Sequence, residues 1–141
     1  MYSDDNQTLS YEVVDHESDI GVIVYGKTYE ELFSNAVYAM ADLIVDVSRL
    51  KENRKMHEVI SGKTPEDIMV NLLSRVLFYL DTYYILYYRI TSKYSDGELD
   101  AYFYGSEIPE GIEYRNVIKA VTYSDLAVKP EEGYAKIIFD L

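Results

Sequence analysis

Two stretches of the chain combine a helix-start signal with apolar residues at helical spacing, and this pair constrains the fold more than any other feature. In the first, Thr28 stands three residues before Glu31, as in a capping box, which predicts a helix reaching about Asp46. In the second, Thr64 precedes Pro65, which suits the first position of a helix. Each helix would carry one broad apolar face, and two such faces need a sheet to cover them. The apolar residues are Leu32, Phe33, Ala36, Val37, Met40, Leu43 and Ile44 in the first stretch, and Ile68, Met69, Leu72, Leu73, Val76, Leu77 and Leu80 in the second.

Elsewhere, apolar residues alternate with polar ones in short runs, a pattern that predicts strands. In one of these runs Tyr84, Leu86, Tyr88 and Ile90 are expected to share a face. The order of the elements is mixed and we find no internal repeat, so we predict an α+β fold with two helices packed on mostly antiparallel strands. The predicted strands cover residues 11–14, 22–25, 54–60, 83–93, 98–104, 117–123, 125–129 and 134–141.

Composition limits the chemistry that this chain can perform. Its 141 residues fit one domain, 1–141, in which about the first eight residues are expected to be flexible. The chain has no cysteine and only two histidines, so a metal would be held mainly by oxygen, which favours calcium, magnesium or manganese. A net charge of −12 repels phosphate backbones, and we expect no stable direct binding of nucleic acid. No apolar run could span a bilayer and the N-terminus is no signal peptide, so we expect no membrane association and a cytoplasmic location.

Residues 15–21, Asp-His-Glu-Ser-Asp-Ile-Gly, form the one polar group of potential metal ligands between strongly apolar neighbours. They are predicted to cross between two strands, with Gly21 relaxing the backbone. His16 and Asp19 would then be nitrogen and oxygen ligands on a rigid support. The alternative is a plain turn, because Asp, Ser and Gly are common turn residues.

Two features nearer the C-terminus could complete such a site. Lys119 falls in a strand-like run among apolar residues, where it either extends outward from an edge strand or stands beside carboxylates as a cation. Asp140 and the terminal carboxylate of Leu141 come directly after a strand, and neighbouring carboxylates repel unless a cation or proton lies between them. If this end lies beside residues 15–21, then Asp19, Asp140 and Leu141 make an oxygen-rich cage. The alternative is a frayed terminus.

Other chemistries have little support. The chain has no phosphate-binding loop, no nucleophile elbow and no dinucleotide fingerprint. His16 could act as an acid or base, but no activated nucleophile accompanies it. His57 is expected on a surface strand with no chemical role.

Taken together, these segments resemble the archease family. The resemblance rests on residues 15–21, on residues 25–33 (Tyr-Gly-Lys-Thr-Tyr-Glu-Glu-Leu-Phe), on residues 119–123 (Lys-Ala-Val-Thr-Tyr) and on the Ile-Phe-Asp-Leu end at 138–141. It covers nearly the whole chain in the family's order. Two departures are mild: Glu17 and Ser18 replace the middle Thr-Ala of the family's His-Thr-Ala-Asp-Ile-Gly pattern, and Ser124 stands where a histidine is frequent.

The resemblance implies a fold with two helices and an inserted strand–helix–strand–strand module. It also implies a non-enzymatic accessory protein of the tRNA-splicing RNA ligase RtcB, which speeds guanylylation of the ligase and supports multiple turnover. By match of position, Asp19, Asp140 and Leu141 would hold a metal such as calcium, with His16 and Lys119 as further functional residues. Two alternatives stay open: a small metal-dependent phosphoesterase that uses His16, and a metal-independent protein chaperone.

Overall fold

The computed structural model describes residues 10–15 and 18–141, and it folds them into two helices and seven strands. The segment of about eight N-terminal residues that was predicted to be flexible lies outside the described residues. The helices are α1 (Tyr29–Ile44) and α2 (Pro65–Tyr83), and short 3-10 turns occupy Val47–Arg49 and Pro130–Glu132. The strands are β1 (Tyr11–Asp15), β2 (Asp19–Tyr25), β3 (Arg54–Ser61), β4 (Ile85–Ser95), β5 (Glu98–Glu107), β6 (Ala120–Lys129) and β7 (Tyr134–Asp140).

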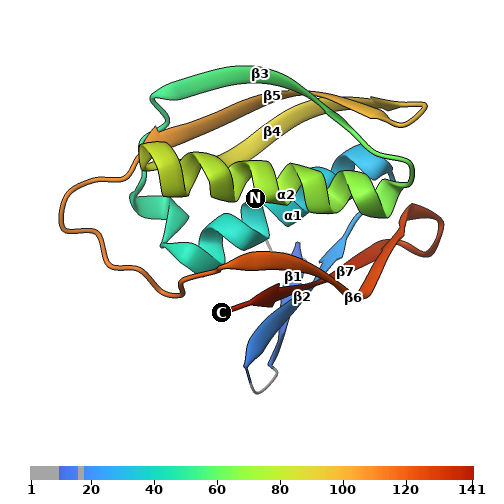
Figure 1. Ribbon diagram of the computed structural model, residues 1–141, viewed down its shortest axis with the longest axis horizontal. Helices are drawn as coiled ribbons and strands as arrows, with labels where there is room; N and C mark the ends of the chain where they lie inside the picture. The colour runs from blue at the N-terminus through green and yellow to red at the C-terminus, as the bar shows by residue number, and fades with distance from the viewer. Residues whose placement is uncertain (1–9, 16–17) are drawn as a thin grey trace, which may run out of the picture.

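The strands form two antiparallel sheets with the helices between them (Figure 1). One sheet has the order β1-β2-β7-β6, and the other has the order β3-β5-β4. Helix α1 packs against β4 and β2, while α2 packs against β6, β4 and β3, so each helix contacts both sheets. The stretch β3-α2-β4-β5 is inserted between α1 and β6, and its strands make up the second sheet by themselves. The predicted α+β fold with an inserted strand–helix–strand–strand module is confirmed.

The helices form where the sequence signals placed them, because their first turns are capped locally. The hydroxyl oxygen of Thr28 accepts a hydrogen bond from the backbone N–H of Glu31 at 3.1 Å. Thr64 does the same for Asp67 at 3.1 Å, and Pro65 is the first residue of α2. The apolar stripes of both helices are buried, as their spacing predicts.

A repeated segment begins both helices, and the prediction that the chain contains no internal repeat is wrong. Residues 26–35 and 62–71 share Gly-Lys-Thr at their start, Glu at the fifth position and Asn at the tenth. In both copies the Asn side chain donates to the last carbonyl of the preceding strand, and the Glu accepts a backbone N–H from another strand. The bonds are Asn35 to Tyr25 at 2.6 Å, Asn71 to Ser61 at 2.8 Å, Tyr94 to Glu30 at 3.0 Å and Val128 to Glu66 at 3.2 Å.

Replacing Thr64 with alanine is expected to lower the free energy of unfolding by about 1 kcal/mol, because a first-turn N–H of α2 loses its acceptor. The matched control is Thr64→Ser, which keeps the hydroxyl oxygen and should change stability by only a few tenths of a kcal/mol. Urea unfolding of the two variants beside the wild type measures the difference. Equal stability of the alanine and serine variants would show that the cap contributes nothing.

Three strand predictions need correction. The strand expected over 83–93 begins later, because α2 continues to Tyr83 and Tyr84 caps it. The pairing of β4 with β5 shifts between Tyr87 and Arg89, and both Leu86 and Tyr87 are buried, which strict alternation does not allow. The runs expected over 117–123 and 125–129 form one strand, β6, whose pairing with β7 is interrupted between Thr122 and Ala127.

Candidate metal centre

The pairing of β2 with β7 places the predicted ligands side by side. In this antiparallel pair Asp19 lies directly opposite Asp140. Residues opposite each other across a sheet have Cβ atoms about 4.5–5.5 Å apart and project from the same face. The chain's tail therefore returns to β2, the strand that contains residues 19–21 of the predicted crossing, as expected for a shared site.

The apolar residues of the two strands set this pairing. One face of the sheet packs against the helices, and its alternate residues are buried. A slip of one residue would move this entire apolar set to the other face, so the pairing is strongly specified. Asp19 and Asp140 fall on the opposite face, where Asp19 is half-buried and Asp140 is exposed. The buried set comprises Ile20, Val22 and Val24 from β2 and Ala135, Ile137 and Phe139 from β7.

The C-terminus is held on both sides. Asp140 also lies opposite Ala120 of β6, and its carbonyl oxygen accepts a hydrogen bond from the backbone N–H of Lys119 at 2.8 Å. Strand β7 extends to Asp140, and Phe139 before it is fully buried. The sheet thus fixes the backbone up to the penultimate residue, and the terminal residue Leu141 follows with 40% of its surface exposed.

The other predicted residues lie at different places in the structure. His16 and Glu17 lie outside the described residues. Lys119 precedes β6 by one residue instead of lying within a strand, and it is exposed. Gly21 is paired inside β2 and does not form part of a turn. His57 lies exposed on β3 beside Asp100.

These observations define a donor set of two carboxylates with the chain terminus next to one of them. Oxygen-only donors suit hard cations such as Ca²⁺, which accepts several carboxylate oxygens at flexible geometry. Across residues 10–15 and 18–141, no group of three His, Cys, Asp or Glu side chains is arranged around one metal position. The predicted third ligand is a terminal carboxylate, so the metal assignment stays a prediction.

The loop before Lys119 is anchored to the end of α1, a feature that the sequence analysis missed. The backbone N–H of Arg115 donates to the carbonyl of Ile44 at 2.7 Å, and the amide of Asn116 donates to the carbonyl of Leu43 at 2.7 Å. The Arg115 guanidinium lies 3.4 Å from the carboxylate of Asp42. These bonds fix the approach of the chain to Lys119 and Asp140.

The Asp42 carboxylate also binds β1 to α1. It accepts a hydrogen bond from the hydroxyl of Tyr11 at 2.7 Å. Burial raises the pKa of Tyr11 well above its usual value, and the hydrogen bond to Asp42 raises it further. Such long-range polar contacts leave no local signal in the sequence, which is why spacing alone did not reveal them.

Comparison with known proteins identifies relatives over nearly the whole chain. Residues 11–141 match the model of the archease protein family (MTH1598/TM1083). The chain is 98% identical over 141 residues to the protein archease of Thermoplasma acidophilum, and the match covers all of both chains. It is 76% identical over 133 residues to the protein archease of Thermoplasma volcanium, covering 94% of this chain and 100% of the relative.

Two solved structures share the fold. The solution structure of Methanobacterium thermoautotrophicum protein 1598 matches with a TM-score of 0.73 and 28% identity, covering 94% of this chain and 99% of the other. A crystal structure of an archease from Thermotoga maritima, described as a possible chaperone, matches with a TM-score of 0.59 and 20% identity. That second match covers 96% of this chain and 100% of the other, and it shows likeness of fold alone.

Proposed function

This chain belongs to the archease family, and on that basis we propose that it is a non-enzymatic activator of an RtcB-type RNA ligase. In this proposal it promotes guanylylation of the ligase and supports multiple turnover, acting as one domain in the cytoplasm. The main structural support for this proposal is the pairing of Asp19 with Asp140 beside the C-terminus. It is what a carboxylate metal site at these residues requires.

The sheet would preorganise the ligands. Asp19 and Asp140 would each contribute carboxylate oxygens from neighbouring strands, and the terminal carboxylate of Leu141 would contribute from the next position along the chain. Strand pairing fixes both backbones before any ligand arrives, so little ordering is needed on binding. A bound divalent cation, which we expect to be Ca²⁺ with Mn²⁺ or Mg²⁺ as alternatives, would supply positive charge that offsets phosphate charge at the ligase.

Charge supports a protein partner over a nucleic acid. A net charge of −12 disfavours stable binding to RNA but favours encounter with a basic protein surface. The chain would then act through the ligase and leave RNA recognition to it. Among the described residues no helix is both long and apolar enough to cross a bilayer, and the proposal involves no membrane.

A metal-independent chaperone is the second candidate, favoured by the description of the Thermotoga maritima structure as a possible chaperone. In that case the chain would mask a surface of its partner, and the carboxylates would matter only for solubility. The phosphoesterase alternative depends on His16, which lies outside the described residues.

An assay with the cognate ligase tests the proposal. We expect the purified chain to increase both the rate of ligase guanylylation and the number of RNA ends joined per ligase molecule. The chain alone should hydrolyse no phosphomonoester or phosphodiester. No stimulation of a ligase that is itself active would contradict the proposed function, and hydrolysis by the chain alone would favour the phosphoesterase.

A further inference from the structure

The residue that ends α2 has an unfavourable backbone and an exposed side chain. Tyr84 caps the helix with φ 58° and ψ 37°, in the left-handed region that glycine and asparagine adopt most readily. Its side chain is 68% exposed, so packing compensates little for the conformation. The backbone conformation itself serves to end the helix, because the Tyr84 N–H donates to the carbonyls of Leu80 and Tyr79, and its carbonyl accepts the N–H of Ile108 at 2.9 Å. The exposed ring takes no part in these bonds.

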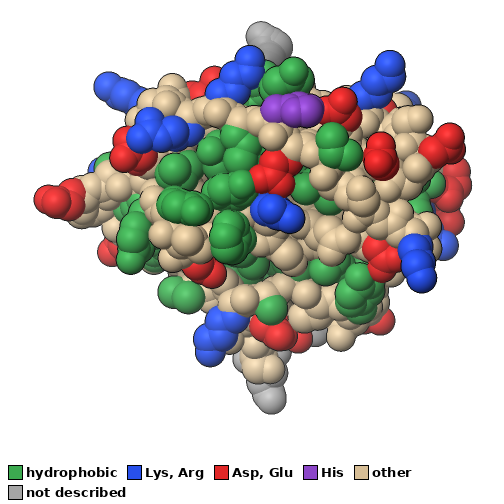
Figure 2. All heavy atoms as spheres, turned by 45° about the horizontal axis from the view of Figure 1, so that its top comes forward, with side chains coloured by type: hydrophobic (Ala, Val, Ile, Leu, Met, Phe, Trp, Pro, Cys, Tyr) green, Lys and Arg blue, Asp and Glu red, His purple; other side chains and the backbone are tan. Residues whose placement is uncertain are grey.

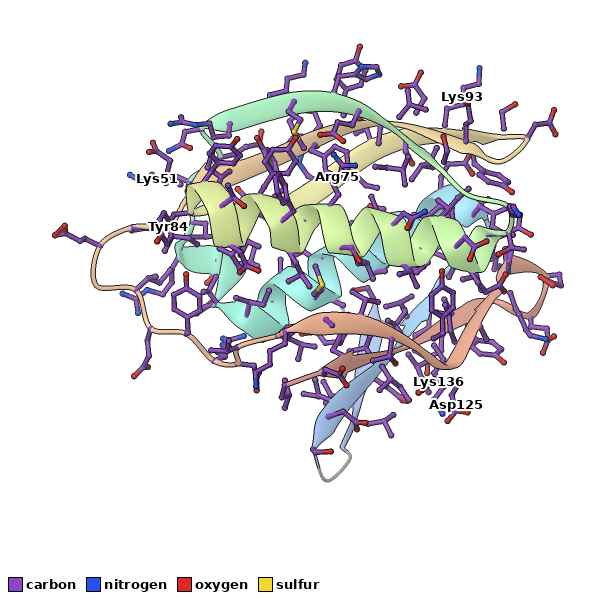
Figure 3. The ribbon with its side chains drawn as sticks, viewed as in Figure 1. Lys51, Arg75, Tyr84, Lys93, Asp125 and Lys136 are labelled. Carbon is purple, nitrogen blue, oxygen red and sulfur yellow. The ribbon has the colours of Figure 1, made fainter. Side chains whose placement is uncertain are left out.

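Tyr84 belongs to a group of exposed apolar side chains that we name the aromatic end of α2. Tyr83 is 58% exposed and Phe78 is 48% exposed, and their rings stack edge to face. Tyr114 and Val117, from the anchored loop, are 42% and 67% exposed. Figure 2 shows hydrophobic side chains gathered in the left part of the view. Figure 3 shows Tyr84 at the end of α2. Exposed apolar patches of this kind mark protein interfaces, where tyrosine is enriched.

A recess of about 150 Å³ lies within this patch, between the end of α2 and the anchored loop. It is smaller than the roughly 300–1,000 Å³ of small-molecule sites, and it suits a single inserted side chain. Asp81, Tyr84, Tyr114 and Val117 help to line it, and Asp81 is the one charged residue in its lining. Burial raises the pKa of Tyr114, and the negative charge of Asp81 raises it further.

The charges around the recess favour a cation. The last turn of α2 contains no basic residue, so the negative end of the helix dipole is not compensated there. The faces of tyrosine rings attract ammonium and guanidinium groups. An arginine or lysine side chain also has an apolar stem that can pack against Val117 while its charged head reaches Asp81.

The recess adjoins the candidate metal centre. Val117 and Ile118 line it, and the next residue, Lys119, donates its backbone N–H to the carbonyl of Asp140 at 2.8 Å. One partner surface could therefore cover both the recess and the carboxylate pair. Because the loop is bonded to Ile44 and Leu43, the two features are held in fixed relation.

We propose that this recess receives an arginine or lysine side chain of the protein partner, and that the aromatic end of α2 is the surface on which that partner docks. The identity of the partner rests on the proposed function, in which it is the RNA ligase. The recess then orients the ligase so that its active site meets Asp19 and Asp140.

Binding of the full chain to the cognate ligase, measured by calorimetry at two salt concentrations, tests the proposal. Tyr84→Asn should weaken binding about ten-fold, because a desolvated cation–π contact is lost. Asparagine suits the left-handed backbone, so the melting temperature should stay the same or rise. Asp81→Asn should also weaken binding and reduce its dependence on salt. The control is Tyr123→Asn, which removes a ring that is 59% exposed near the opposite end of α2, where it contacts Asp67.

The outcomes separate this inference from the proposed function. If the wild type binds and activates the ligase while Tyr84→Asn and Asp81→Asn bind equally well, the recess is not the docking site and the inference is overturned alone. If the wild type neither binds nor activates the ligase, the proposed function fails and the inference fails with it. If the wild type is a dimer that Tyr84→Asn dissociates, the patch joins two copies of this chain and the inference is likewise overturned.

Discussion

In the variant Asp140→Asn, calcium is expected to lose its effect on the melting temperature. For the wild type, calcium at about a hundred times its dissociation constant should stabilise the fold by about 2.7 kcal/mol, which corresponds to roughly 10 °C. The variant lacks one of two carboxylates that lie opposite each other in the β2–β7 pair. Thermal unfolding followed by circular dichroism, over a series of calcium concentrations, measures both responses.

Without calcium, the Asp140→Asn variant is expected to be at least as stable as the wild type. Like charges directly opposite each other across a sheet destabilise it, so removing one should leave the metal-free melting temperature unchanged or raised. A variant that is less stable without metal, yet insensitive to calcium, would point to a structural role for Asp140 instead.

The matched control is Asp125→Asn, which makes the same change of charge in the same sheet. Asp125 is exposed, has a φ of 50° that asparagine tolerates, and lies 3.9 Å from Lys136 in a solvent-exposed ion pair (Figure 3). This variant should keep the full calcium response. If Asp140→Asn keeps it as well, the cation is held elsewhere or not at all.

Replacing Gly105 with alanine is expected to destabilise the fold by about 4 kcal/mol or more. A Cβ atom at this position would lie 2.3 Å from the carbonyl oxygen of Leu86 and 2.6 Å from the Cα of Tyr87. Both atoms belong to the backbone of β4, which cannot rotate away as a side chain can. Since domains of this size are stable by only about 5–15 kcal/mol, urea unfolding should show a large shift of the midpoint.

Gly21→Ala is the control for this change. Gly21 also lies inside a strand, but a Cβ there would meet its nearest atom, the carbonyl oxygen of Val14, at 3.4 Å, which is ordinary contact. We expect a change in stability below about 1 kcal/mol. If both alanine variants are equally stable, the close approach of β4 to Gly105 is not a constraint on the fold.

The helices could be predicted because their signals are local. Thr28, Thr64 and Pro65 act within one turn of the helices they begin, and the apolar stripes report burial directly. The candidate site was predicted for a related reason. Alternation in the last strand placed Phe139 on the buried face and Asp140 on the other face. Only the identity of the strand that pairs with it, β2, was not determined by this pattern.

The remaining features depend on contacts between distant residues. Strands β3, β4 and β5 form a sheet of their own. This arrangement depends on how the helices are covered, and no single segment of the sequence determines it. The irregular pairing at Tyr87 and the left-handed backbone of Tyr84 leave no trace in a hydrophobic pattern, because both residues read as ordinary strand tyrosines. The repeated Gly-Lys-Thr segments could have been found from the sequence, and their matched hydrogen bonds explain why both copies look alike.

The central claim is that activation of the ligase depends on a cation held where β2 meets β7. The most direct test counts the RNA ends joined per ligase molecule in the presence of wild-type chain, Asp140→Asn and Asp125→Asn at equal concentration. We predict many joined ends per ligase with the wild type and with Asp125→Asn, and about one or fewer with Asp140→Asn. Full turnover supported by Asp140→Asn would contradict the claim.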